Sequence, residues 1–249
     1  MSYDGLDRLT DVDSPMYGST GAHYAYDVLD NLTHLVAPGR DHWYCYTGNQ
    51  LTNVKTGGCG GTSEIGLGYD PQGNLENKNG TLYAFDYGNR LRQAGPESYR
   101  YDAYGRRTRS SSSAGLLYTL YDQHGQLRWI RDERQGERRQ YIYLQGSLLA
   151  EHTRAIGGST HTLTYQHTDA LGTPVAKTNA SRTVVERSDY EPYGKLLNHP
   201  LEDGPGYTGH VSDAATGLSY MQQRYYDPRI GVFLSVDPIS VDGSTGWNF

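Results

Sequence analysis

Tyrosine and aspartate recur together along the chain, each time at the end of a short run in which apolar and polar residues alternate. Before the Tyr101-Asp102 pair, Tyr99 and Tyr101 alternate with Arg100. This period of two predicts a β-strand with its tyrosines on one face. Asp suits the first position of a tight turn, where its carboxylate accepts hydrogen bonds from backbone N–H groups ahead, and Gly suits the fourth position. Each Tyr-Asp segment is therefore predicted to be the turn of a β-hairpin.

Approximate copies of this segment are spaced about 20 residues apart. They begin at Tyr3, Tyr26, Tyr46, Tyr69, Phe85, Tyr101 and Tyr121. A single hairpin is marginally stable and leaves two edges unpaired, whereas neighbouring hairpins pair their edges and share one buried layer. Gly and Pro interrupt the chain frequently, and a helical pattern with caps never extends beyond about two turns. The sequence predicts an all-β fold made of β-hairpins.

The composition changes the picture of the core. Leu, Ile, Val and Phe make up only about 18% of the residues, below the roughly 20% that warns of disorder, but the net charge of −6 is modest and there are 23 tyrosines. A thin layer of tyrosines is predicted as the apolar phase, rather than a thick aliphatic core. The charge balance gives no general attraction to nucleic acid. The segment Arg128–Arg139 interleaves acids and bases, which favours a solvated face.

Candidate chemistry outside the repeats is sparse. A disulfide between Cys45 and Cys59 is one possibility, but two cysteines cannot form a zinc site alone. The two cysteines do not show whether the protein resides in an oxidising or a reducing compartment. His161 and His167 would lie about 20 Å apart on one strand, which argues against a shared metal ion. No cofactor is expected. No apolar run of about 18 residues is present, and the first residues lack the pattern of a signal peptide, so no membrane span is expected and the location is left open.

From about Gly157 the regular spacing ends and more specific strings appear. They are YQHTDALGTPVAKT from Tyr165, ERSDYEPYGKLL from Glu186, and the stretch from Pro205 to Pro238 that contains RYYDPRIGVFLSVDP. The chain resembles the Rhs and YD-repeat family, bacterial relatives of the teneurin shell. The matching positions of the core motif are His167, Asp169, Gly172, Pro174, Tyr226, Asp227 and Pro228. The resemblance implies a YD-repeat array over 1–155, an Rhs-associated core over 156–240 and a truncated tail of that core over 241–249.

The resemblance further implies that the β-sheet curls into a hollow shell around a C-terminal toxin, and that full-length relatives are exported or delivered by a secretion system. In this family the core also cleaves itself by an aspartyl-type reaction. Arg224 and Asp237 match two of its three residues. The second aspartate belongs to a D-P-x-G-L string that this sequence does not contain, so self-cleavage is not expected. Arg224 is also suited to a structural role, either stacking on a tyrosine or pairing with Asp237.

Three functions remain as hypotheses. The first is a non-catalytic shell fragment, with the rest of the shell and a C-terminal toxin domain as its partners. The second is a module that binds carbohydrate or a cell surface through exposed tyrosines. The third is a self-cleaving core, in which Asp242 or Asp227 would replace the missing carboxylate. Asp227 is instead expected to stabilise its own turn. In the string HTDALG, His167 and Asp169 are expected to bond to the backbone.

Overall fold

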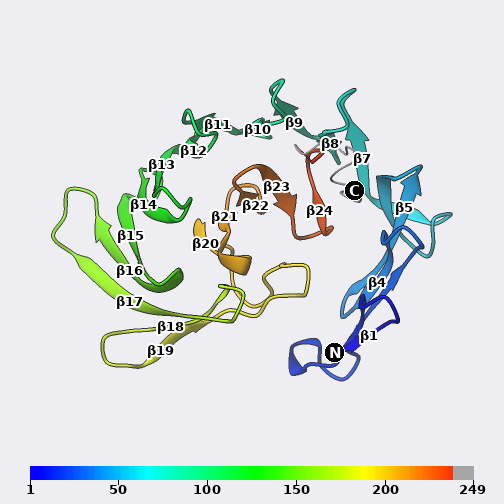
Figure 1. Cartoon of the computed structure of the whole chain (residues 1–249), viewed down its shortest axis with the longest axis horizontal. Coiled ribbons are helices and arrows are strands. Elements are labelled where there is room, and N and C mark those ends of the chain that lie inside the picture. Colours follow the sequence, from blue (N-terminus) through cyan, green and yellow to red (C-terminus); the bar gives the residue numbers. More distant parts are fainter. Residues whose placement is uncertain (238–249) are drawn as a thin grey trace. The chain divides into compact units, whose positions relative to one another are not determined.

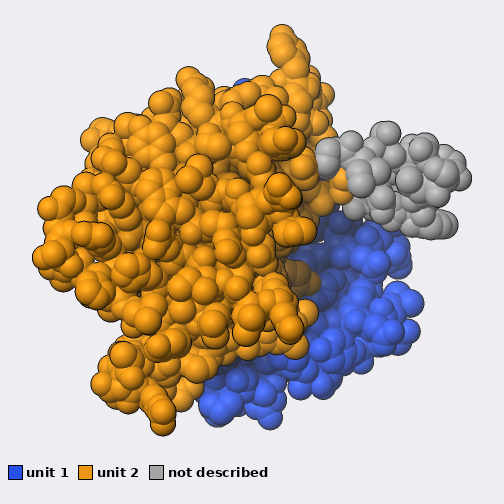
Figure 2. All heavy atoms as spheres, turned by 60° about the vertical axis from the view of Figure 1, so that its left-hand side comes forward, with its two compact units in different colours: residues 1–70, 75–81 blue, residues 71–74, 82–249 orange. Residues whose placement is uncertain are grey.

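The computed structural model describes residues 1–237, and these residues are almost entirely strands and turns. Helical structure in this part of the chain is limited to two short 3-10 helices, η1 (Pro15–Tyr17) and η2 (Tyr207–Gly209). The chain divides into two compact units (Figure 2). Unit 1 comprises residues 1–70 and 75–81, and unit 2 comprises residues 71–74 and those from 82 onward. The all-β prediction is confirmed.

Unit 1 is a meander in which each strand pairs antiparallel with the next one in the sequence. A disulfide joins Cys45 in the fifth strand to Cys59 in the turn after the sixth, so the pairing that the sequence left open is present. Its strands are β1 (Ser2–Tyr3), β2 (Leu9–Val12), β3 (Ala22–Tyr26), β4 (Leu32–Ala37), β5 (Arg40–Thr47), β6 (Gln50–Thr56), β7 (Thr62–Tyr69) and β8 (Leu75–Lys78).

Unit 2 contains a longer meander of the same kind, which we call the strip. The hairpin pairing continues without interruption past residue 155, and the boundary expected there stays a prediction. The strip comprises β9 (Thr81–Phe85), β10 (Leu91–Ala94), β11 (Glu97–Tyr101), β12 (Arg107–Ser112), β13 (Gly115–Tyr121), β14 (Leu127–Asp132), β15 (Glu137–Leu144), β16 (Ser147–Ala155), β17 (His161–Thr168), β18 (Pro174–Thr178) and β19 (Val184–Arg187).

A second, smaller sheet follows the strip in unit 2, and we call it the inner sheet. Within this unit the strip curves around the inner sheet, so that one face of the strip is covered (Figure 1). Its antiparallel strands are β20 (Gly204–Pro205), β21 (Val211–Asp213), β22 (Leu218–Met221), β23 (Arg224–Asp227) and β24 (Val232–Phe233).

The Tyr-Asp turns are built as the sequence predicts. In the turn at Asp102, one carboxylate oxygen accepts hydrogen bonds from the backbone N–H groups of Tyr104 and Arg106, both at 2.9 Å. The other oxygen pairs with the Arg106 side chain at 3.0 Å. The fourth residue of the turn, Gly105, has a φ of 77°, a left-handed conformation that costs glycine little. The same two backbone bonds recur at Asp4, Asp27, Asp86, Asp122 and Asp169.

The tyrosine of the repeat has its own partner one repeat back. The Tyr101 hydroxyl donates to the backbone carbonyl of Leu91 at 2.5 Å, and Tyr46 and Tyr69 donate in the same way to the leucines that follow the preceding turns, Leu32 and Leu51. Burial raises the pKa of Tyr101 to about 12, so its hydroxyl keeps the proton that it donates. In these three copies the tyrosine therefore ties its own hairpin to the previous one, which gives one reason for its recurrence.

The core differs in one respect from the tyrosine layer that the composition predicts. Leucines are buried about as often as tyrosines, and several of them follow a Tyr-Asp turn, as Leu91 and Leu127 do. In unit 2, tyrosines dominate where the strip meets the inner sheet. The Tyr99 ring lies 5.3 Å from that of Tyr225, which lies 5.1 Å from that of Tyr220. The core therefore combines leucines with tyrosines, and in unit 2 a group of tyrosines lies where the strip meets the inner sheet.

No helix among the described residues is long and apolar enough to cross a membrane.

Candidate functional site

The contact between the strip and the inner sheet is centred on one buried arginine. Arg107 begins β12 and is 1% exposed. Its guanidinium lies 2.6 Å from the carboxylate of Asp213 in β21 and donates to the Tyr225 hydroxyl at 3.2 Å. It also lies 5.0 to 5.8 Å from the ring centres of Tyr99, Tyr220 and Tyr225. These contacts hold a full charge in a site closed to water.

Electrostatics keep Arg107 charged. Burial by itself would lower the pKa of Arg107, but Tyr225 and Asp213 hold that pKa well above its ordinary value. The Tyr99 hydroxyl donates to the same oxygen of Asp213 at 3.0 Å, and the backbone N–H of Arg107 donates to the Tyr220 hydroxyl at 2.8 Å. A buried pair satisfied in this way is costly to break, because the partner that is left keeps its desolvation penalty.

Arg107 was not singled out in the sequence, but a signal was present there. In the copies at Asp4, Asp27, Asp70, Asp86 and Asp122 the fifth residue after the Asp is a leucine: Leu9, Leu32, Leu75, Leu91 and Leu127. In the copy at Asp102 that position holds Arg107. A charged residue at a position that is otherwise apolar predicts a buried partner elsewhere in the chain.

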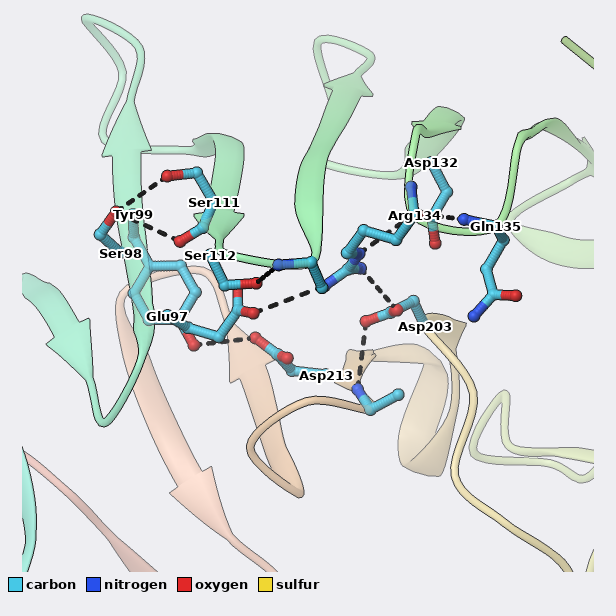
Figure 3. A network of polar contacts seen from close by, with 12 residues as sticks. Glu97, Ser98, Tyr99, Ser111, Ser112, Asp132, Arg134, Gln135, Asp203 and Asp213 are labelled. Carbon is cyan, nitrogen blue, oxygen red and sulfur yellow. Dashed lines mark hydrogen bonds and ion pairs between the residues drawn. The ribbon is translucent and has the colours of Figure 1, made fainter.

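A second polar network lies at the turn between β14 and β15 (Figure 3). The Arg134 guanidinium lies 3.1 Å from Asp132, 2.8 Å from Asp203 and 3.7 Å from Glu97. Asp203 precedes the inner sheet, so Arg134 is a second tie between that sheet and the strip. Burial, and after it the charge of Asp213, raises the pKa of Asp203, whereas Arg134 opposes the rise. The arrangement concentrates carboxylates around a small number of guanidinium groups.

The prediction that Arg128–Arg139 forms a solvated face is wrong for part of the segment. Asp132 is 1% exposed and Arg139 is 7% exposed, and Arg139 donates to the backbone carbonyl of Asp203. The interleaved charges do pair with one another, but the inner sheet and the segment before it cover them. Sequence spacing could not reveal that this segment is buried, because Asp203, which covers it, lies 64 residues from Arg139.

Arg224 and Asp237 lie together, which is one of the two structural roles expected for Arg224. Their side chains form an ion pair at 3.0 Å, and the Arg224 guanidinium lies 3.7 Å from the centre of the Phe233 ring. Both side chains are partly exposed. Asp227 accepts a hydrogen bond from the backbone N–H of Arg229 at 2.9 Å and so stabilises its own turn. Asp242 lies outside the described residues. The cleavage roles of Arg224 and Asp237 stay a prediction.

The remaining motif residues have structural surroundings in unit 2. Asp169 bonds to the backbone of its turn, as expected, but His167 does not, because its ring contacts the Thr178 hydroxyl at 3.0 Å. Gly172 is left-handed at φ 86°, and Pro174 begins β18. Tyr226 donates to the backbone carbonyl of Tyr193 at 3.0 Å.

Pro228 follows in the turn that Asp227 stabilises. Within residues 1–237 no group of three or more His, Cys, Asp or Glu side chains is placed to hold a metal ion.

Comparison with known proteins places these features in context. The sequence profile of the teneurin YD-shell family matches residues 1–243. The tRNA3(Ser)-specific nuclease WapA of Bacillus spizizenii is 26% identical over 203 residues, which cover 76% of this chain and 8% of that protein. The probable deoxyribonuclease RhsA of Dickeya dadantii is 30% identical over 175 residues, which cover 65% of this chain and 12% of that protein.

A solved structure shares the fold. The crystal structure of TcdB2-TccC3-TEV matches 95% of this chain and 15% of its own chain, with a TM-score of 0.55 and 16% sequence identity. The chain thus spans a small part of the length of each of these relatives.

Proposed function

The chain belongs to the teneurin YD-shell family, and on that premise we propose that it serves as a non-catalytic wall segment of a shell that encloses a toxin. The strip would supply the wall, and the inner sheet would line it from the enclosed side. Nuclease activity is named for the relatives as whole proteins, of which the matched segments are 8% and 12%. The proposal gives this chain the enclosing role and leaves the toxic activity to a separate domain.

The observation that carries the proposal is the buried tie between strip and inner sheet. Arg107 occupies a position that holds leucine in other repeats, and its charge is satisfied by Asp213 of the inner sheet. A wall that must hold its lining in place needs such a specific contact, because tyrosine packing alone allows alternative registers. In this proposal Arg224 and Asp237 stabilise the end of the inner sheet by pairing with each other.

The enclosing role is tested by grafting this chain in place of the matching segment of RhsA from Dickeya dadantii. The graft should keep the region that follows it in RhsA resistant to limited proteolysis. A graft that carries Arg107→Asp should lose that protection. A graft that carries Arg100→Asp should keep it, because Arg100 is exposed, on the face of β11 opposite to the buried Tyr99. Folding of each graft is verified by circular dichroism. Equal protease sensitivity of the two substituted grafts would contradict the proposal.

The absence of catalysis is tested on the chain itself. Intact-mass measurement over several days of incubation should show one unchanged species. A cut that appears in this chain and disappears in Asp237→Asn would show that the chain cleaves itself. Asp237 would then act together with a second carboxylate of this chain.

Carbohydrate binding is a second candidate, and an open groove of about 580 Å³ in unit 2 favours it. Tyr104 is 79% exposed and lines this groove with His124 and Gln222. An exposed aromatic ring beside amide and imidazole groups suits the apolar face and the hydroxyls of a sugar. If the groove binds sugar, Tyr104→Ala should abolish signals on a glycan array. Tyr87→Ala is the matched control, because Tyr87 is 99% exposed and does not line the groove. Equal effects of the two substitutions would reject the groove.

A further inference from the structure

Unit 2 contains an acidic cavity that the proposed function does not use. It encloses about 460 Å³ between the covered face of the strip and the segment that leads into the inner sheet. The strip places its lining residues on one face, because residues opposite each other in antiparallel strands point the same way. Asp132 pairs with Glu137, and Glu151 pairs with Thr164. The carboxylates that line the cavity are those of Asp132, Glu137, Glu151, Glu202 and Asp203.

The cations around the cavity do not balance these five carboxylates. Arg139 lies 3.1 Å from Glu137, and Lys177 lies 3.1 Å from Glu202. Arg134 serves Asp132 and Asp203 together, as described above. Three cations therefore face five carboxylates, and Lys177 is shared further with Glu186 at 2.8 Å. The cavity holds an excess of about two negative charges.

Two acceptors in particular are weakly paired. Glu151 has a hydrogen bond from the Thr153 hydroxyl at 3.0 Å, but it forms no ion pair with any described residue. Oδ2 of Asp132 is buried and accepts no hydrogen bond within the described residues, and its ion pair with Arg139 is long, at 3.8 Å. A buried carboxylate oxygen without a donor costs roughly 1–3 kcal/mol or more. This oxygen belongs to a side chain that is 1% exposed and lines the cavity, so a donor brought into the cavity would remove that cost.

The charge excess also acts on the pKa of Glu137. Burial raises the pKa of Glu137, and Glu151 adds to that rise against the effect of Arg139. A cation in the cavity would relieve both the missing hydrogen bond and the repulsion between carboxylates.

We propose that this cavity binds an alkylammonium group, supplied by a free polyamine or by a lysine side chain. An ammonium group carries three donors on a compact charge, and its alkyl stem needs only a narrow space. The cavity volume is within the range of small-molecule sites. The hydroxyls of Thr153 and Thr164, which also line it, offer further acceptors. The carboxylates do not converge as metal ligands do, which favours an organic cation. The site does not depend on the shell role of the chain.

Isothermal titration of the full chain with spermidine tests this site. We expect one site per chain, with affinity lowered at least about tenfold in Glu151→Gln, since a hydrogen bond to a charged group is lost. Glu76→Gln is the matched control, because it removes the same charge from an exposed position of unit 1, and its affinity should stay within about twofold. Circular dichroism verifies that both variants are folded.

A second titration with Nα-acetyl-lysine amide separates the two sources. Binding of spermidine alone assigns the site to free polyamines, and binding of the lysine derivative assigns it to a side chain. Absence of binding by both would overturn the proposal. It would also be overturned by unchanged affinity in Glu151→Gln, or by magnesium chloride at equal ionic strength producing the same heat at the same stoichiometry.

Discussion

Replacing Arg107 with leucine restores the residue that the other repeats carry, yet it should destabilise unit 2. The substitution leaves the Asp213 carboxylate, 2% exposed, with the Tyr99 hydroxyl as its side-chain donor. Removing one partner of a buried ion pair costs about 3–5 kcal/mol, because the remaining charge stays desolvated and unpaired. The loss of contact between the guanidinium and the three tyrosine rings acts in the same direction.

The double variant Arg107→Leu/Asp213→Asn separates the charge pair from packing. Without the carboxylate no buried charge is left, so part of the lost stability should return, with a coupling free energy of about 2 kcal/mol or more. Urea unfolding followed by circular dichroism and by tyrosine fluorescence measures these free energies. Arg100→Leu is the control on the neighbouring strand. Arg100 is exposed and forms no ion pair with any described residue, so its replacement should cost no more than about 1 kcal/mol.

A cost below about 1 kcal/mol for Arg107→Leu would contradict this prediction, as would costs of the two substitutions that simply add in the double variant. Either result would show that the guanidinium and the carboxylate do not depend on each other.

Three further predictions concern the repeats and unit 1. Tyr101→Phe should cost about 1 kcal/mol, since it removes one hydrogen bond to a backbone carbonyl while keeping the ring, and a neutral result in urea unfolding would mean that the bond contributes nothing. Asp102 has a pKa below its ordinary value of 3.8, despite burial, because the backbone and side chain of Arg106 bond to it. Its contribution to stability is therefore present above pH 3.8 and lost as the pH falls through the folded-state pKa. In Asp102→Asn, the free energy of unfolding should therefore depend less on pH in this acid range. Reduction of the disulfide between Cys45 and Cys59, which closes a loop of about 15 residues, should lower the stability of unit 1 by about 3 kcal/mol, measured by urea unfolding with and without reductant.

The local features of the fold could be predicted from the sequence, because their causes lie within a few residues. The carboxylate of Asp102 bonds to backbone groups two and four residues ahead, so a short window contains the whole turn. Alternation around Tyr99 likewise indicates which face is buried. The bond from Tyr101 to the previous repeat spans 10 residues, and the repeat itself indicates that such a contact should recur.

The ties between the strip and the inner sheet could not be predicted in the same way. Arg107 and Asp213 are 106 residues apart, and no local pattern relates them. The charged segment containing Arg134 suggests a solvated surface as long as the distant Asp203 is not considered. The unusual arginine at a leucine position was the one local indication of this site, and it indicates a partner without identifying it.

Hydrogen–deuterium exchange can show whether the inner sheet is docked on the strip through Arg107. Amides of β21 to β23 should exchange as slowly as those of β11 to β13 in the unmodified chain. In Arg107→Leu both groups should lose protection together, while strands β5 and β6 of unit 1 keep theirs. Rapid exchange of β21 to β23 in the unmodified chain, beside a protected strip, would contradict the claim.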